Sequence, residues 1–315
     1  MKINSVQLEP CTPPLWASEG HSQTLFGYFL PSPKIQKEKE IWQIPLDDGD
    51  QLIAEFYQGT SDIIFLLFHG LNGSSQADYM QRVGQLFINQ GHSVLLVNHR
   101  GCGIGKGFAK GLYHSGSAND LARVIEFSKS KFPNSNHTAI GFSLGANALL
   151  LLLSDETKTQ PHHAIAVNAP VDLERTSVAL TQGFNKLYDK HFVLLSTLEL
   201  RQKLNLSFTI PRSLREFDAK FTAQVSGFES REDYYQKCST ADKLQKIKTP
   251  TVILTAKDDP IIPWQSYRVA DFSPSTHFHL ENHGGHLGYL SSKKTPLNTF
   301  RWLDYAINEY VKCWV

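Results

Sequence analysis

The sequence predicts an α/β protein with a mostly parallel, doubly wound sheet and an inserted helical cap. Two observations predict the sheet: short continuous apolar runs, such as residues 63–68 and 93–97, and the helical stretches that alternate with them. A third observation predicts the cap, because this alternation stops between residues 170 and 248. Sheets of this kind bind ligands outside the carboxyl ends of their strands. We therefore expect the functional residues in the loops at that edge.

The first part of the chain predicts an arm followed by a hairpin. Residues 1–38 are rich in proline and aromatic residues without clear periodicity, so we expect an extended N-terminal arm packed on the core. The strand-like runs 41–46 and 51–57 flank an Asp-Gly pair, which is a strong turn signal. These two runs are expected to pair as a hairpin.

The core is expected to occupy residues 39–169 and 249–315. Its further strands are predicted over residues 63–68, 93–97, 137–140, 163–168, 251–255 and 277–280. Its helices are predicted over about residues 76–89, 117–131, 144–153, 264–270 and 297–312.

The helical cap is expected over residues 170–248. Its first part has apolar residues at helical spacing, namely Phe184, Leu187, Tyr188, Phe192, Leu195 and Leu198. Because this segment lies in sequence between two core strands, it would cover the carboxyl edge of the sheet. A roof rich in Phe, Leu and Tyr favours an acyl chain as the ligand, since burial of apolar surface stabilises bound hydrocarbon.

Composition and charge exclude several classes of protein. The 315 residues carry a formal net charge of +1, which gives no reason to propose nucleic acid as a partner. The first ten residues lack an apolar signal region, and the longest aliphatic run, residues 149–153, is too short to span a membrane. We expect a cytoplasmic protein without an integral membrane segment, and its oligomeric state stays open.

The cysteines favour a reduced compartment. All four are widely separated and none belongs to a C-x-x-C pair, so neither a disulfide framework nor a structural zinc site is predicted for Cys11, Cys102, Cys238 and Cys313.

The central motif is a G-x-S-x-G element over residues 141–145, with Ser143 at its middle. A β-prone run, 137–140, precedes it and an entirely apolar helical run, 144–153, follows it, which is the context that the motif requires. Glycines at the two flanking positions let a strand turn directly into a helix, and the serine hydroxyl then projects at the top of the sheet. The motif therefore predicts a nucleophilic serine.

A nucleophilic serine needs a base to remove its proton and an acid to orient that base. Asp258 and Asp259 directly follow the predicted strand 251–255, and His286 follows the last predicted strand in a glycine-rich loop. The order serine, acid, histidine along the chain occurs in one large class of triad enzymes. On spacing alone, either aspartate could be the acid.

Other histidines offer alternatives. His283 could compete with His286 as the base. His277 and His279 alternate onto one face of a predicted strand, where a metal could bind, but no third ligand has a telling spacing. We therefore predict neither a metal site nor a cofactor.

An oxyanion hole is expected from two backbone N–H groups, because the negative oxygen of a tetrahedral intermediate needs two donors. The first candidate is Leu144, the residue after the nucleophile, at the start of a helix. The second is Leu71, in the loop after strand 63–68, where Gly70 lets the backbone approach the substrate.

Eight motifs spread over nearly the whole chain carry a family resemblance. They are GHSQTL at 20–25, HGLNGSS at 69–75, NHRGC at 98–102, GFSLGAN at 141–147, FD at 217–218, YY at 234–235, DDP at 258–260 and GGHLG at 284–288. Together they resemble the α/β hydrolases, and specifically the YheT-like or AB hydrolase 4 family. The chain departs from this family at Ala146, where a further glycine is common, and we expect it to be without the N-terminal membrane anchor of the eukaryotic members.

The resemblance implies the α/β-hydrolase fold and an acyl-enzyme mechanism. In related hydrolases the acid stands four residues before the proline of a D-x-hydrophobic-hydrophobic-P stretch, which favours Asp259, four residues before Pro263, over Asp258. We expect cleavage of small carboxylic esters with short to medium acyl chains, with Ser143 as nucleophile and His286 as base. Alternatives are an acyltransferase (ester synthase) or thioesterase with the same triad, or a non-catalytic binding protein.

Two motifs of the resemblance have no chemical role that the sequence explains. The Gln23-Thr24 pair and the Arg100-Gly101-Cys102 run are expected to brace the sheet edge and the arm. Cys102 has no constellation of basic neighbours that would make it a convincing nucleophile.

Overall fold

A computed structural model describes residues 6–205 and 207–314. These residues fold around one eight-stranded sheet. The strand order is β1-β2-β4-β3-β5-β6-β7-β8. The strands are β1 (Glu40–Pro45), β2 (Gln51–Tyr57), β3 (Ile63–Phe68), β4 (Ser93–Asn98), β5 (Asn136–Phe142), β6 (His163–Val167), β7 (Thr251–Ala256) and β8 (Thr276–Glu281).

The sheet is mostly parallel, as predicted. β1 and β2 form the expected hairpin, and β2 is also antiparallel to β4. All other neighbouring strands pair in parallel. The carboxyl ends of the parallel strands therefore meet at one edge, where the loops after β3, β5, β7 and β8 lie together.

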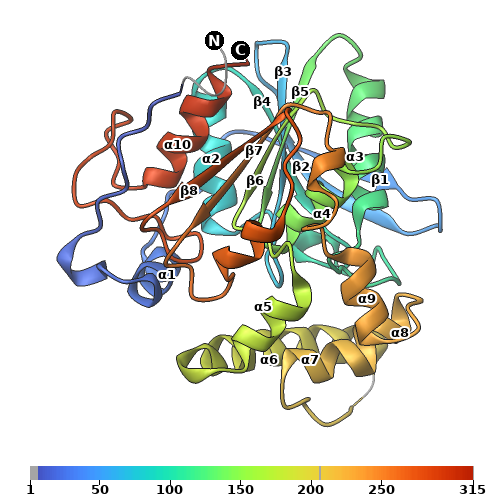
Figure 1. The fold of residues 1–315 in the computed structure, drawn as a ribbon. Helices are drawn as coiled ribbons and strands as arrows, with labels where there is room; N and C mark the ends of the chain where they lie inside the picture. The colour runs from blue at the N-terminus through green and yellow to red at the C-terminus, as the bar shows by residue number, and fades with distance from the viewer. Residues whose placement is uncertain (1–5, 206, 315) are drawn as a thin grey trace.

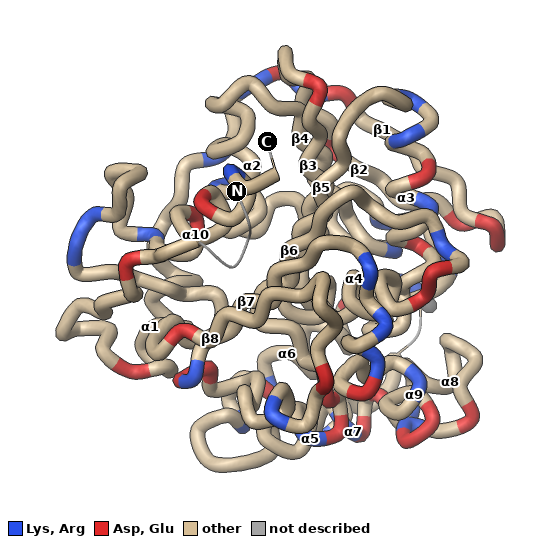
Figure 2. The backbone as a smooth tube through the Cα atoms, turned by 45° about the horizontal axis from the view of Figure 1, so that its top comes forward, with Lys and Arg blue, Asp and Glu red and all other residues tan. Residues whose placement is uncertain are grey.

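Helices cover both faces of the sheet (Figure 1). α2 (Asp78–Asn89) and α10 (Trp302–Val311) pack on one face, where residues such as Val83 and Leu303 join the buried cluster. α3 (Ala118–Lys131) and α4 (Leu144–Leu153) pack on the other face. The central strands β3, β5, β6 and β7 contain no Lys, Arg, Asp or Glu, and their tubes are tan in Figure 2. Two-sided burial explains why they are continuous apolar runs.

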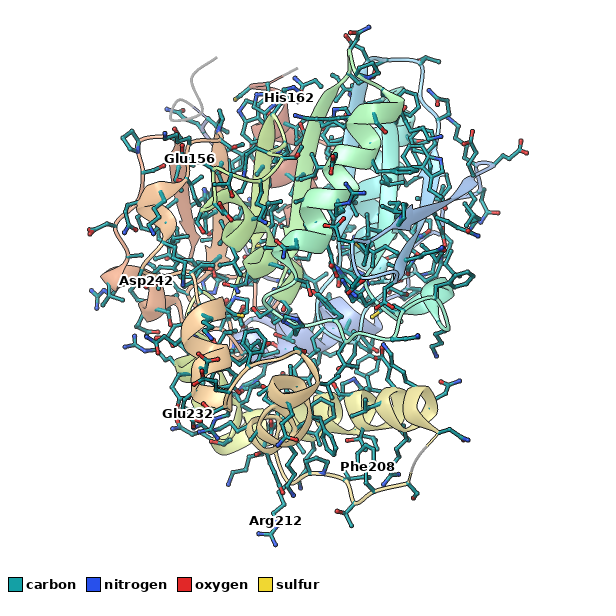
Figure 3. All side chains as sticks on the ribbon, turned by 90° about the vertical axis from the view of Figure 1, so that its right-hand side faces the viewer. Glu156, His162, Phe208, Arg212, Glu232 and Asp242 are labelled. Carbon is teal, nitrogen blue, oxygen red and sulfur yellow. The ribbon has the colours of Figure 1, made fainter. Side chains whose placement is uncertain are left out.

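A group of helices lies between β6 and β7 in the chain. It comprises α5 (Leu173–Leu180), η4 (Gly183–Asn185), α6 (Lys186–Leu204), α7 (Leu214–Phe217), the π-helical turn η5 (Asp218–Thr222), α8 (Ala223–Val225), α9 (Arg231–Cys238) and η6 (Leu244–Lys246). Figures 1 and 3 show α5 to α9 beyond the carboxyl edge of the sheet, with Phe208, Arg212 and Glu232 far from His162 at the opposite end. The apolar residues at helical spacing after Phe184 all belong to α6.

The N-terminal arm differs from the extended segment that we expected. Residues 15–17 form the short helix η2 (Leu15–Ala17), and α1 (Gly20–Phe29) is a ten-residue helix. A capping box between Glu19 and Ser22 starts α1, and tertiary packing holds a helix that shows little periodicity of its own. The first five residues of the predicted arm lie outside the described part of the chain.

Two predicted helices near the C-terminus also differ. The stretch around residue 264 is the 3-10 helix η7 (Trp264–Val269), and α10 begins at Trp302 rather than near residue 297. Arg301 forms an isolated antiparallel bridge with Leu290, so the backbone before α10 is extended. Within residues 6–205 and 207–314, no helix is long and apolar enough to cross a lipid bilayer.

Candidate active site

Ser143 lies at a sharp turn between β5 and α4. Its backbone has φ 51° and ψ −121°, a conformation that L-residues rarely adopt. A Cβ atom at Gly145 would lie 2.4 Å from the carbonyl oxygen of His69, and one at Gly141 would lie 2.7 Å from the Cα of Ala146. Both flanking positions therefore need glycine for lack of space. The backbone N–H of Ser143 donates to Val167 O at 2.8 Å, which fixes the strained turn to β6.

The loops after β7 and β8 bring a histidine and an aspartate to this serine. His286 Nε2 lies 2.9 Å from Ser143 Oγ, and His286 Nδ1 lies 2.8 Å from Asp259 Oδ2. The imidazole thus bridges the hydroxyl and the carboxylate. With the Nδ1 proton donated to Asp259, Nε2 is left as an acceptor for the serine hydroxyl.

Several hydrogen-bond donors surround the carboxylate of Asp259. Its side chain is completely buried, and Oδ1 accepts the backbone N–H groups of Ile261 at 2.8 Å and Ile262 at 3.0 Å. Oδ2 accepts both from His286 and from the amide Nδ2 of Asn168, the latter at 2.6 Å. These four hydrogen bonds fix the position of the carboxylate, and the one to Nδ1 orients the imidazole.

Asn168 is a site residue that the sequence analysis missed. It follows β6 directly and has φ 49°, which asparagine tolerates better than most residues. Besides its bond to Asp259, its Nδ2 donates to Gly285 O at 3.4 Å and its Oδ1 accepts from the Tyr289 hydroxyl at 2.9 Å. Asn168 therefore ties the acid to the histidine loop. Its place at the carboxyl end of a parallel strand was the signal that could have found it.

Asp258, the alternative acid, contacts a different part of the histidine loop. Its Oδ1 accepts the backbone N–H groups of Gly284 and Gly285, each at 2.9 Å. Its Oδ2 lies 3.5 Å from Nδ1 of His283, the histidine that we considered as a competing base. The structure thus brings Asp259 to His286 and leaves Asp258 and His283 as a separate pair.

The two candidate oxyanion donors, Leu71 and Leu144, both line the cavity beside Ser143. Neither backbone N–H has an acceptor among the described residues, so both are free to bind a ligand oxygen. A Cβ atom at Gly70 would lie 2.9 Å from the Cβ of Ser143. This close approach brings the loop after β3 to the nucleophile.

A buried histidine fixes the loop that carries Leu71. His69 Nδ1 donates to Gly70 O at 2.7 Å, and its Nε2 accepts the backbone N–H of His99 at 3.2 Å. Burial lowers the pKa of His69 to about 4, so the ring is neutral, as these two roles require. The hydroxyl of Tyr79 accepts the Gly70 N–H at 3.0 Å, and the Tyr113 hydroxyl donates to His69 O at 2.9 Å.

The cavity at Ser143 has a volume of about 110 Å³ and is largely apolar. Its apolar walls come from the helices between β6 and β7 and from the loop after Asp259: Leu173, Leu180, Phe192, Leu200, Phe217 and Ile262. One buried carboxyl group also reaches it. Burial raises the pKa of Asp218 to about 6, although hydrogen bonds from Thr222 and Tyr235 oppose this rise.

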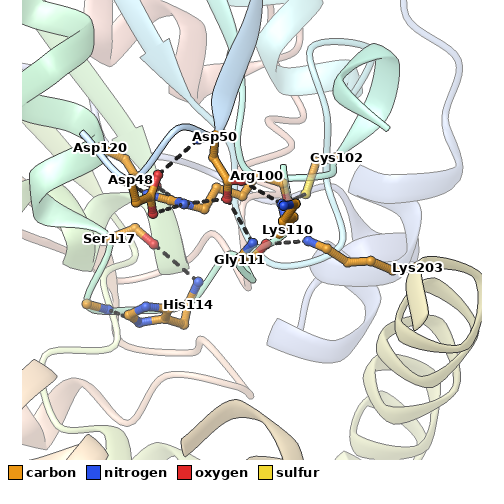
Figure 4. Close-up of polar contacts among 11 residues, drawn as sticks. Asp48, Asp50, Arg100, Cys102, Lys110, Gly111, His114, Ser117, Asp120 and Lys203 are labelled. Atoms are coloured by element: carbon orange, nitrogen blue, oxygen red, sulfur yellow. Dashed lines mark hydrogen bonds and ion pairs between the residues drawn. The ribbon is translucent and has the colours of Figure 1, made fainter. Parts of the chain in front are cut away.

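The Arg100-Gly101-Cys102 run forms a structural cluster (Figure 4). The Arg100 guanidinium contacts the carboxylates of Asp48 and Asp50 at 2.6 Å and of Asp120 at 2.7 Å, so it joins the β1–β2 turn to α3. Burial raises the pKa of the Cys102 thiol well above its usual range, which makes it a poor nucleophile.

The histidines considered for a metal site pack around a tyrosine. His279 Nδ1 and His277 Nε2 lie 2.7 and 3.2 Å from the Tyr310 hydroxyl. The described residues contain no group of three or more His, Cys, Asp or Glu side chains that could hold a metal ion.

A family profile described as "alpha/beta hydrolase fold" matches residues 63–293. The chain belongs to the α/β hydrolases. It is 30% identical over 287 residues to "Putative esterase YheT" of Escherichia coli (strain K12), which covers 86% of this chain and 84% of that protein. The chain is therefore a YheT-like α/β hydrolase, and the family predicted from the motifs is confirmed.

More distant comparisons agree with this assignment. The chain is 24% identical over 337 residues to human "Phospholipase ABHD3", covering 98% of this chain and 80% of that protein. The solved structure of the Pyrococcus furiosus esterase Pf2001 superposes with a TM-score of 0.58 at 16% identity, over 90% of this chain and 99% of that chain. The superposition supports the fold, and the two sequence relatives, named as a putative esterase and a phospholipase, support a hydrolase of this general type.

Proposed function

We propose that this α/β hydrolase cleaves carboxylic esters through an acyl-enzyme formed on Ser143. The observation that carries the proposal is the continuous contact from Ser143 Oγ through both nitrogens of His286 to Asp259, at 2.9 and 2.8 Å, at the wall of an apolar cavity. Nucleophile, base and acid within hydrogen-bond reach are what covalent catalysis by a serine requires.

In the acylation step, His286 Nε2 takes the proton of Ser143 as Oγ attacks the ester carbonyl. The carbonyl oxygen becomes negative, and the free N–H groups of Leu71 and Leu144 stabilise it. His286 then gives its proton to the leaving alkoxide, and the alcohol departs. In the second half, His286 takes a proton from water, the hydroxide attacks the acyl group, and the carboxylic acid leaves as Ser143 recovers its proton.

The cavity supports a short to medium acyl chain. Phe192 and Leu200 of α6 line it together with Ser143, so an acyl group on the serine would extend along apolar side chains. Each methylene buried there contributes about 0.8 kcal/mol, equivalent to about fourfold in kcat/KM. The gain ends when the cavity is full, and longer chains must then displace the helices.

A series of p-nitrophenyl esters from two to twelve carbons tests this proposal. We expect kcat/KM to rise with chain length, reach a maximum at short to medium length and then fall. Leu200→Phe should move the maximum to a shorter chain, because Leu200 is buried at the cavity. Leu194→Phe, on the exposed side of the same helix, is the matched control and should leave the maximum unchanged. Equal kcat/KM values across the series would refute the assigned acyl pocket.

A further inference from the structure

Helix α1 of the N-terminal arm packs directly against the loop that carries His286. In Figure 1, α1 lies beside the carboxyl end of β8, which this loop follows. A Cβ atom at Gly285 would lie 2.5 Å from Gly20 O, and one at Gly288 would lie 2.2 Å from Gln23 O. Only backbone therefore fits between the helix and the loop. A contact this close transmits any displacement of α1 to the loop.

Thr24, on the buried side of α1, bonds to the backbone of the candidate base itself. Its Oγ1 accepts the backbone N–H of His286 at 2.8 Å and donates its own proton to Gly20 O at 2.7 Å. Thr24 is 8% exposed, so water has little access to replace either bond. Because its proton is donated to Gly20 O, the hydroxyl oxygen acts as the acceptor for the His286 N–H.

The neighbouring Gln23 fixes the end of the same loop. Its side chain is fully buried, its Oε1 accepts the N–H of Leu290 at 2.6 Å, and its Nε2 donates to Leu290 O at 3.0 Å. The amide thus pairs with Leu290 as a neighbouring strand would. A second donation from Nε2, to Ala17 O at 2.8 Å, ties the amide to η2 of the arm.

Three consecutive backbone N–H groups of the loop are accepted by side chains. The N–H groups of Gly284 and Gly285 donate to Asp258, and the N–H of His286 donates to Thr24. Asp258 follows β7 and belongs to the core, whereas Thr24 comes from the arm, 262 residues away in the chain. Without the Thr24 hydroxyl, the N–H at the histidine itself would face no acceptor, and the loop would shift to reach one.

We propose that Thr24 is a positioning residue for the esterase reaction, which holds the backbone of His286 so that its Nε2 stays at 2.9 Å from Ser143 Oγ. This inference rests on the proposed function, because it assigns a task only if His286 is the base. The Gln23-Thr24 motif would then act in catalysis through the histidine loop, beyond bracing the arm. Proton transfer is sensitive to such alignment, and a displacement near 1 Å lowers rates by about 100-fold.

Thr24→Val tests the proposal, because valine keeps the shape of threonine and removes the acceptor. We expect kcat for a p-nitrophenyl ester to fall about 10- to 100-fold with KM within about twofold, since substrate contacts are unchanged. Thr24→Ser keeps the hydroxyl and should stay within about threefold of the wild-type kcat. The matched control is Thr138→Val, at a buried threonine of β5 whose hydroxyl has no partner among the described residues, and it should retain activity.

The outcomes separate this inference from the proposed function. If Ser143→Ala abolishes turnover while Thr24→Val keeps the wild-type kcat, or if the Val and Ser variants lose kcat equally, the positioning role is wrong and the esterase mechanism stands. If Ser143→Ala keeps its activity, the proposed function itself is wrong. Should Thr24→Val fail to fold, as thermal unfolding would reveal, Thr24→Ala takes its place with the same expected split between kcat and KM.

Discussion

Asp258 and Asp259 are consecutive residues that hold two different parts of one loop. Asp259 accepts the side-chain proton of His286 at Nδ1, whereas Asp258 accepts the backbone N–H groups of Gly284 and Gly285 just before it. One aspartate therefore orients the imidazole and the other shapes the backbone that carries it. This division of roles leads to different expectations for the two carboxylates.

Replacement of the two aspartates by asparagine should separate these roles. Asp259→Asn puts an amide where Nδ1 needs a carboxylate, so the imidazole loses its orienting acceptor and we expect kcat to fall roughly 10³- to 10⁴-fold. Asp258→Asn keeps an oxygen that can accept both glycine N–H groups, so kcat should change by no more than about threefold. Ester hydrolysis by the two purified variants measures this directly. A larger loss in Asp258→Asn would reassign the acid.

The sequence predicted the parts of the site whose signals are local. The turn at Ser143, the aspartates after β7 and the loop of His286 were found because short stretches of sequence carry the motif and its strand-turn-helix context. The sheet was predicted for the same reason, since buried strands are continuous apolar runs.

The contacts that join distant segments could not be predicted. Asn168 follows its strand without any motif, and only the packed structure brings it to Asp259. Helix α1 shows little periodicity, and its contact with the histidine loop depends on glycines that are far apart in the chain, such as Gly27 and Gly288. Both features depend on tertiary packing. The conformational preference of a short stretch does not reveal which distant segments pack together.

The turn glycine Gly145 should be intolerant of even one methyl group. In Gly145→Ala the new Cβ would lie 2.4 Å from His69 O and 2.8 Å from Phe68 O, and backbone atoms cannot move aside as a flexible side chain could. We expect a loss of about 1–3 kcal/mol in the free energy of unfolding, together with reduced turnover. Gly105→Ala is the control, because its nearest contact would be an ordinary 3.7 Å. Equal stability of both variants in urea unfolding would contradict the packing described here.

Asp218 should make stability depend on pH. Its pKa is raised to about 6 from 3.8, chiefly by burial, so the folded protein binds this proton more tightly than the unfolded chain does. The stability from this group is fully present below about pH 4 and is lost as the pH rises through 6. The loss is about 3 kcal/mol, since a tenfold difference in proton affinity between the folded and unfolded states corresponds to about 1.4 kcal/mol.

The Asp218→Asn variant isolates this contribution. Relative to the wild type, its free energy of unfolding should increase by about 2 kcal/mol between pH 4 and pH 7, because the asparagine does not titrate. Urea unfolding of both proteins at the two pH values gives the difference. A difference that stays constant with pH would mean that Asp218 titrates normally in the folded protein.

The most direct test of the account compares ester hydrolysis by the wild type, Ser143→Ala, His286→Ala and the double variant, together with labelling by a fluorophosphonate probe. Because Ser143 and His286 act together, each single change should remove most of the turnover, the double change should cost little more, and Ser143→Ala should abolish labelling. Full turnover or full labelling in Ser143→Ala would contradict the assignment of Ser143 as the nucleophile.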